Sequence, residues 1–387
     1  MKNRLVVIGS AVAASVGLCM AVAPAAMAQP LKVTVACGDV AALLTAVGDA
    51  NGNAEGGTIT LAKDCAYRFA DDFDDSGTAL PAITGKVKII GHNSTLIRSV
   101  TEGVSYFRII SVNEGGELLL KGTTVTGGRT DGYGGGIGNA GTLRLEDSKV
   151  AGNLATGQGG GIHNTGGTVT LVDSDVLTNV VTNANDTDGD GGGISNDAEG
   201  TLTLKKSTVA GNAADGDGGG IANAGTLNVE HGLVVNNEAR DGSGGGIYNL
   251  GTAKLKYTKV VENWAGVDGG GVHNGEEATL DVHESAIADN RTGNDGGGLN
   301  NAGTATLKKT KVESNQAGHD GGGINNVAET AGGVTELTLD RSTVAENRAA
   351  GVGGGINNGE GAVVTLTNSK IVKNLPTNCA GTVPGCA

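Results

Sequence analysis

The chain has 387 residues, of which 70 are glycine and only 2% are aromatic, and its formal net charge is −14. A single globular core of this length would use more large side chains, and abundant glycine without proline enrichment indicates a repetitive, turn-rich structure rather than a disordered linker. The negative charge argues against nucleic acid and anionic lipid as partners.

Residues 1–28 predict a cleavable signal peptide. Two basic residues near the start precede an apolar run that ends in Ala26-Met27-Ala28, a small-x-small cleavage pattern. We therefore expect a mature chain that starts at Gln29 and is secreted, either free outside the cell or loosely associated with the cell wall. No second apolar stretch is long enough to span a bilayer, so we expect no membrane span after cleavage.

Residues 29–56 predict an N-terminal cap. Asp39 to Ala50 has the pattern of an amphipathic helix, with Leu43 and Val47 on its apolar face and Asp39 as its N-cap. Irregularly spaced period-2 segments follow within residues 57–133, for example at 57–61 and 86–90, and we expect each of them to be a strand of a coil.

Residues 134–375 contain nine close copies of a repeat of about 25 residues. Each copy has a Gly-Gly-Gly triplet, an aliphatic residue, any residue and an asparagine, then an apolar-x-apolar strand, and then Val or Ile with a second asparagine three positions later. The first asparagine series is Asn139, Asn164, Asn196, Asn223, Asn249, Asn274, Asn301, Asn326 and Asn358, and the second is Asn153, Asn179, Asn212, Asn237, Asn263, Asn290, Asn315, Asn347 and Asn374.

These repeats predict an all-β fold, a right-handed parallel β-helix with three short strands per coil and a short N-terminal capping helix. One unit cannot bury its own apolar residues, whereas stacked units about 4.8 Å apart share a continuous core. We expect the asparagines to point inward and to form amide ladders, each hydrogen bond contributing about 1 kcal/mol. The glycine triplet suits a tight corner that needs positive φ or close backbone approach.

Four cysteines remain after signal cleavage, in one pair at each end of the chain: Cys37, Cys65, Cys379 and Cys386. An even number in an exported protein indicates two disulfides. Pairing within each end is our prediction, although the sequence alone permits three connectivities. The pair within residues 376–387 would form a C-terminal disulfide cap.

The pattern Gly-Gly-Gly-Ile-x-Asn followed by Val-x-x-Asn resembles the repeats of polymorphic outer membrane proteins. The segments from Cys37 to Ala50 and from Asn378 to Cys386 resemble secreted bacterial β-helix proteins of the pectin-lyase-like superfamily. The resemblance implies the fold, but that superfamily includes lyases, hydrolases, adhesins and proteins without known activity, so function must come from the site.

The best catalytic cluster on the outward positions is Asp281 and His283, with Lys254 one coil away. The favoured interpretation is a mixed-charge solvated face. The sequence therefore favours a structural or binding, adhesin-like protein without catalysis, and a polysaccharide lyase or glycoside hydrolase is the alternative.

A second column of outward positions forms a polar stripe that we interpret as a possible contact surface for an extracellular glycan or a cell-surface component. The alternative interpretation of this stripe is an ordinary polar face. Its members are Tyr248, His273, Asn300, Asn325 and Asn357.

One insertion predicts a calcium site. Asp186, Asp188 and Asp190 form the Asp-x-Asp-x-Asp-Gly opening of an EF-hand-type loop, and the next coil brings Asp215 and Asp217 to the equivalent turn. Crowded carboxylates would favour a hard divalent cation. The alternative is a solvated Asp-Gly turn. Later coils place a single aspartate at the same position, three residues before the end of the glycine triplet, and this column is a further calcium candidate: Asp268, Asp295 and Asp320.

Overall fold

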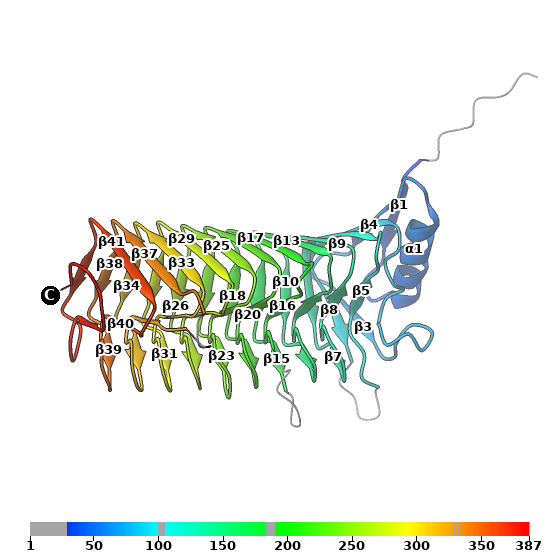
Figure 1. Cartoon of the computed structure of the whole chain (residues 1–387). Coiled ribbons are helices and arrows are strands. Elements are labelled where there is room, and N and C mark those ends of the chain that lie inside the picture. The colour runs from blue at the N-terminus through cyan, green and yellow to red at the C-terminus, as the bar shows by residue number, and fades with distance from the viewer. Residues whose placement is uncertain (1–28, 100–104, 183–189, 329, 331–332, 387) are drawn as a thin grey trace, which may run out of the picture.

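The computed structural model describes residues 29–99, 105–182, 190–328, 330 and 333–386. The expected signal peptide, residues 1–28, lies outside the described residues. The described chain winds into a long solenoid with its N- and C-terminal ends at opposite tips (Figure 1). Every strand pairing is parallel, so the structure confirms the predicted all-β parallel β-helix.

Sheet A is the largest sheet, with 23 strands: β1 (Leu31–Val35), β2 (Gly57–Leu61), β3 (Ala66–Phe69), β4 (Lys86–Arg98), β6 (Glu117–Thr126), β9 (Thr142–Glu146), β10 (Lys149–Ala151), β13 (Thr168–Val172), β14 (Asp175–Leu177), β17 (Thr201–Lys205), β18 (Thr208–Ala210), β21 (Thr226–Glu230), β22 (Leu233–Val235), β25 (Thr252–Lys256), β26 (Lys259–Val261), β29 (Thr279–His283), β30 (Ala286–Ala288), β33 (Thr304–Lys308), β34 (Lys311–Glu313), β37 (Glu336–Asp340), β38 (Thr343–Ala345), β41 (Val363–Thr367) and β42 (Lys370–Val372). Each regular coil contributes two of these strands.

Sheet B has 11 strands: β5 (Ile110–Val112), β8 (Ile137–Asn139), β12 (Ile162–Asn164), β16 (Ile194–Asn196), β20 (Ile221–Asn223), β24 (Ile247–Asn249), β28 (Val272–Asn274), β32 (Leu299–Asn301), β36 (Ile324–Asn326), β40 (Ile356–Asn358) and β43 (Cys379–Ala380). Sheet C has 9 strands: β7 (Arg129–Thr130), β11 (Leu154–Ala155), β15 (Val180–Val181), β19 (Ala213–Ala214), β23 (Glu238–Ala239), β27 (Trp264–Ala265), β31 (Arg291–Thr292), β35 (Gln316–Ala317) and β39 (Arg348–Ala349). The strands of sheet C have only two residues, too few for a period-2 pattern, and the sequence did not predict them.

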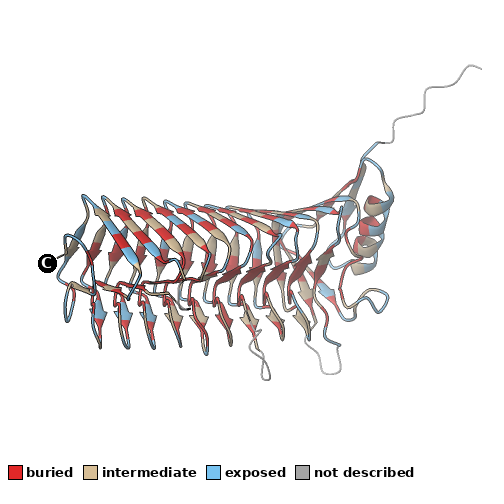
Figure 2. Ribbon diagram, viewed as in Figure 1, coloured by how far each residue is buried: buried red, intermediate tan, exposed pale blue. Residues whose placement is uncertain are grey.

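The core follows the apolar columns of the repeat. Ile194 pairs with Ile221 and Leu202 with Leu227 in the next coil, and all four side chains are fully buried. Buried positions recur in every coil along the solenoid (Figure 2). The inward direction predicted for these residues is confirmed.

Both asparagine series form inward ladders, as predicted. In the first series, Nδ2 of Asn196 donates to Oδ1 of Asn223 at 2.7 Å, and both residues are buried. In the second series, the backbone N–H of Asn212 also donates to Oδ1 of Asn237. Stacked amides therefore satisfy polar groups at two corners of each coil.

The glycine triplet combines both properties expected of it. Gly244, the first of its triplet, has φ of 69°. A Cβ at Gly246, the third, would lie 2.6 Å from the carbonyl oxygen of Gly271 in the next coil. Larger residues would force neighbouring coils apart at this corner.

The N-terminal cap contains α1 (Val40–Gly52), whose N-cap Asp39 accepts a hydrogen bond from the Ala42 amide at 2.9 Å. The helix lies against the first coils, with Leu43 and Val47 fully buried, so the predicted cap is confirmed (Figure 1). The disulfides join Cys37 to Cys65 and Cys379 to Cys386, one at each end of the solenoid. Within the described residues, no helix has the length and apolarity needed to cross a membrane.

Candidate functional site

Sheet B forms the floor of a groove. The middle residue of each of its strands points away from the core, yet Ser195, Ala222 and Asn300 are only 4%, 7% and 4% exposed. Turns that lead from sheet C into sheet B border the floor on one side, and turns that lead from sheet B into sheet A border it on the other. The outward residues of sheet A are more accessible by contrast, since Asn228 is half-buried and Lys254 is exposed.

The predicted polar stripe lies on this floor and is brought into register by consecutive strands of sheet B. The Tyr248 ring stacks on His273, with the ring centroids 4.9 Å apart. Asn300 Nδ2 lies 3.2 Å from His273 Nδ1. Asn325 Nδ2 donates to Asn300 Oδ1, and Asn357 Nδ2 donates to Asn325 Oδ1, both at 2.8 Å. The stripe is therefore an outward ladder whose side chains hold one another in place.

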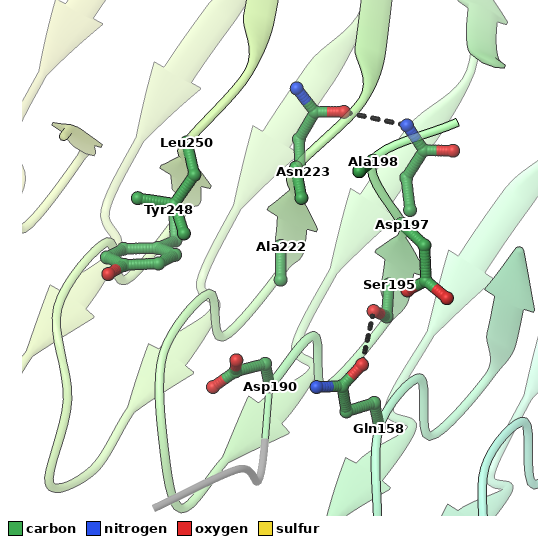
Figure 3. Close-up of a pocket in the computed structure, with 11 residues that line it drawn as sticks. Gln158, Asp190, Ser195, Asp197, Ala198, Ala222, Asn223, Tyr248 and Leu250 are labelled. Atoms are coloured by element: carbon green, nitrogen blue, oxygen red, sulfur yellow. Dashed lines mark hydrogen bonds between the residues drawn. The ribbon is translucent and has the colours of Figure 1, made fainter. Parts of the chain in front are cut away.

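A pocket of about 300 Å³ interrupts the groove next to this ladder. Ala222 is its floor, and the small side chain leaves a hollow between Ser195 and the Tyr248 ring (Figure 3). Ser195 Oγ donates to Gln158 Oε1 at 3.2 Å, which links the floor to one wall. The full lining is Gln158, Asp190, Ser195, Asn196, Asp197, Ala198, Ala222, Asn223, Ala224, Tyr248 and Leu250.

The N-terminal part of the groove contains a buried imidazole. His163 is 7% exposed, stacks on the Tyr133 ring at 5.0 Å, and places Nε2 3.4 Å from Oδ2 of Asp197. Burial lowers the pKa of His163 below its ordinary value of 6.5, Asp197 opposes this shift, and the Arg108 charge adds to it. The imidazole is therefore neutral at neutral pH.

Arg108 lies beside this imidazole. Its guanidinium reaches across Gly138, where a Cβ would meet Nη1 at 2.3 Å. Burial lowers the pKa of Arg108. The buried Nε of Arg108 and the buried Nδ1 of His163 have no hydrogen-bond partner in the part of the chain that the structure describes.

Two further arginines lie in the same N-terminal part of the solenoid, Arg98 at the end of β4 and Arg129 at the start of β7. The Arg129 guanidinium lies 3.9 Å from the centroid of the Tyr106 ring, a cation–π contact, and Arg98 donates to the carbonyl of Gly127 at 2.9 Å. Burial first, and then the Arg129 charge, lower the pKa of Arg98. Among the described residues, none of the three arginines has a carboxylate within salt-bridge distance.

The predicted catalytic cluster lies elsewhere, on the outer face of sheet A. Lys254 pairs with Asp281, and Lys256 with His283, on adjacent strands. Lys254 and Asp281 are exposed, and in the described part of the chain no ion pair within 4 Å joins them. The strands thus bring the three predicted residues side by side, but on an open face rather than in the groove.

The calcium residues are only partly described, since Asp186 and Asp188 lie outside the described residues. Asp190 Oδ1 accepts the backbone N–H of Asp217 at 3.0 Å, and Asp217 Oδ1 accepts the N–H of Ser243 at 2.6 Å. Asp215 Oδ1 lies 2.8 Å from Arg240 Nη1. This column of carboxylates is therefore also a ladder, which binds backbone amides of the next coil, and the calcium site stays a prediction.

The same carboxylate column passes through a different cluster near the C-terminal end. Asp295, His319 and Asp320 place one ligand atom each within 4.8 Å of one another, and they are the one such group in the described residues. His319 Nδ1 lies 3.1 Å from Asp295 Oδ1. The sequence predicted Asp295 and Asp320 as part of the carboxylate column but did not predict His319, which belongs to a turn with no strand pattern.

The groove residues Arg108, Tyr133, Gln158 and Asp197 were not predicted as a site. They come from turns and from an irregular coil, where strand periodicity gives no direction to a side chain. The sequence did contain a signal for the proximity of His163 and Asp197. Their neighbours Asn164 and Asn196 occupy the same position of consecutive repeats and pair in the structure. Alignment of the repeats on that asparagine would have placed Asp197 one coil from His163.

No family model matches the chain, and no curated protein matches it. Solved structures similar to it include pectate lyase Pel9A, with 14% identity, 92% of this chain and 82% of that chain covered, and a TM-score of 0.49. The A-module of the Azotobacter vinelandii mannuronan C-5 epimerase AlgE6 has 13% identity, coverage of 90% and 96%, and a TM-score of 0.49. An iota-carrageenase complexed to iota-carrageenan fragments has 9% identity, coverage of 93% and 92%, and a TM-score of 0.34. Similarity this low carries no activity or ligand to this chain, and it does not show the resemblance to polymorphic outer membrane protein repeats.

Proposed function

We propose that this is a secreted protein that binds an extended extracellular polysaccharide along the groove of sheet B. The observation that carries the proposal is the sunken floor, where most outward side chains are buried although they face away from the core. Coils about 4.8 Å apart repeat at nearly the length of one sugar ring, so consecutive coils can meet consecutive sugars. Two disulfides support secretion.

The pocket between Ser195 and Tyr248 is the proposed sugar subsite. It offers an aromatic face and hydroxyl, amide and carboxylate groups in a small concave space, which is the composition that sugar recognition uses. The ladder from Tyr248 to Asn357 extends the floor with side chains already fixed by one another. Such preorganisation lowers the entropy lost on binding. An adhesin-like role has no comparable observation behind it.

Blocking the pocket tests the proposal. Ala222→Phe fills the hollow at the floor, whereas Asn228→Phe adds the same ring to the outer face of sheet A in the same coil. Affinity electrophoresis through gels that contain neutral, acidic or amino polysaccharides measures binding. We expect the wild type and Asn228→Phe to be retarded by the same polysaccharide and Ala222→Phe to migrate freely. Equal retardation of both variants, or no retardation of the wild type by any polymer, contradicts the proposal.

Cleavage of the bound polysaccharide is the second candidate function. It is favoured by the neutral His163 imidazole, which Asp197 orients beside the Arg108 guanidinium. A neutral imidazole can accept a proton, and a guanidinium can stabilise the negative charge that develops on the substrate. We prefer binding to cleavage as the function because neither nitrogen of His163 is open to a substrate: Nδ1 is buried, and Nε2 already faces Asp197. Release of unsaturated or reducing sugars by the purified protein, abolished by His163→Ala, would reverse this order.

A further inference from the structure

The pocket between Ser195 and Tyr248 receives carboxylates from both sides of the groove. Asp190 comes from the turn that leads into β16, and Asp197 from the turn that leaves it. Figure 3 shows Asp197 next to Ser195, the Tyr248 ring across the hollow from them, and Asp190 below the hollow. Asp190 is anchored there by the Asp217 amide, which donates to its Oδ1 at 3.0 Å.

No lysine, arginine or histidine belongs to the described lining of this pocket. Asp197 contacts His163, but that imidazole is neutral at neutral pH because burial lowers its pKa, so the contact brings no positive charge to the pocket. Arg240 directly follows strand β23 of sheet C. Its guanidinium forms ion pairs with Asp215 at 2.8 Å and with Glu238 at 3.7 Å. The chain as a whole is also acidic, with a formal net charge of −14.

Two carboxylates and an aromatic face in one small space favour a cation. An organic ammonium gains from both charges and from the face of a tyrosine ring, whereas a uronate or sulfate group would meet repulsion. The volume of about 300 Å³ accommodates a sugar ring rather than a bare ion. We propose that this pocket selects a sugar that carries a protonated primary amine, which makes the groove specific for a glycan containing unacetylated amino sugar. The inference rests on the proposed function and names its ligand class.

A pair of oligosaccharides that differ only at the amine tests this specificity. A β-1,4-linked glucosamine hexamer and its fully N-acetylated counterpart are titrated calorimetrically into the full chain, in the presence of a chelator so that no divalent cation can bridge. We expect the glucosamine hexamer to bind about tenfold or more tightly than the acetylated one, and its affinity to fall as salt is added.

Asp197→Asn is the diagnostic variant, because it removes one charge and keeps the shape. We expect it to lose about tenfold in affinity for the glucosamine hexamer and little for the acetylated one. Asp241→Asn is the matched control, since this exposed aspartate lies on a groove-side turn but outside the pocket lining. Its preference for the amine should equal that of the wild type.

The outcomes separate the inference from the function on which it rests. Equal affinity for both hexamers, or an unchanged preference in Asp197→Asn, overturns the ammonium pocket while leaving glycan binding intact. Affinity for a lysine hexamer equal to that for the glucosamine hexamer also overturns it and indicates a basic peptide as the occupant. Failure of every glycan to bind in the groove overturns the proposed function itself.

Discussion

Asn263 and Asn290 are joined by two hydrogen bonds across one coil boundary. Asn290 Oδ1 accepts from Nδ2 of Asn263 at 2.9 Å and from its backbone N–H at 3.0 Å. The other Nδ2 hydrogen of Asn263 goes to the Val234 carbonyl at 3.1 Å, and Asn237 donates to Asn263 Oδ1 from its own amide groups. The side chain of Asn263 therefore links three consecutive coils, because its partners lie in the coils on either side of its own.

Asn263→Ala should lower the free energy of unfolding by about 1–3 kcal/mol, because the Val234 carbonyl and the Asn237 amides lose buried partners. Urea denaturation followed by circular dichroism measures the change. Asn228→Ala, on the outer face of sheet A, is the control and should stay within about 0.5 kcal/mol of the wild type. An unchanged denaturation midpoint in Asn263→Ala would show that the ladder does not stabilise the solenoid.

The asparagine ladder also explains why the fold could be predicted. Each inward column is a physical requirement repeated in every coil, so the same residue recurs at the same place along the sequence. Even the end of the ladder is completed, since Asn378 Oδ1 accepts from the Asn374 backbone at 3.1 Å. The C-terminal cap therefore provides the last asparagine of this series with a partner.

The groove could not be predicted in the same way. Arg108 comes from the irregular coils, and its position over the floor depends on Gly138 having no side chain in the next coil. Asp197 lies in a turn whose length varies between repeats. Such side chains meet through the stacking of turns, which leaves no strand pattern, and for Asp197 the one signal is its place next to Asn196 in the aligned repeats. The stripe from Tyr248 to Asn357 was found because it does lie on strands.

The calcium site remains a prediction that calorimetry can test. Titration of about millimolar calcium into chelator-treated protein should release heat that saturates, since extracellular calcium modules bind in that range. The double variant Asp188→Ala with Asp190→Ala should lose this binding, whereas Asp281→Ala should keep it. Equal binding by the wild type and the double variant would exclude Asp188 and Asp190 as ligands.

Asp295 illustrates a different consequence of the carboxylate column. Its Oδ1 accepts the Asp320 amide at 2.7 Å, and its own amide donates to Asp268 Oδ1 at 2.9 Å. Burial is the main cause that raises the pKa of Asp295 above its ordinary value of 3.8, and the neighbouring Asp268 charge adds to it, against the opposing hydrogen bond from Asp320. The folded chain therefore holds this proton more tightly than the unfolded chain.

Asp295→Asn should consequently gain stability relative to the wild type as pH rises. Below pH 3.8 both states of the wild type are protonated at this position and the two proteins should differ little. As pH rises through the folded pKa, the wild type loses stability because its unfolded state releases the proton first, whereas asparagine keeps an amide oxygen for the Asp320 N–H and carries no charge. Melting temperatures measured across the acidic to neutral range report the difference.

Asp340→Asn provides a control of opposite sign. A hydrogen bond from Arg341 is the main cause that lowers the pKa of Asp340, so its carboxylate stabilises the fold above the unfolded pKa and loses that effect as pH falls through the folded pKa. This variant should be less stable than the wild type at neutral pH and equal to it in acid. The melting temperatures of the two variants, relative to the wild type, should therefore change with pH in opposite directions. A change in the same direction would show that burial in the carboxylate column is not the source of the Asp295 effect, because removal of a charge is stabilising only where the environment of that charge is unfavourable.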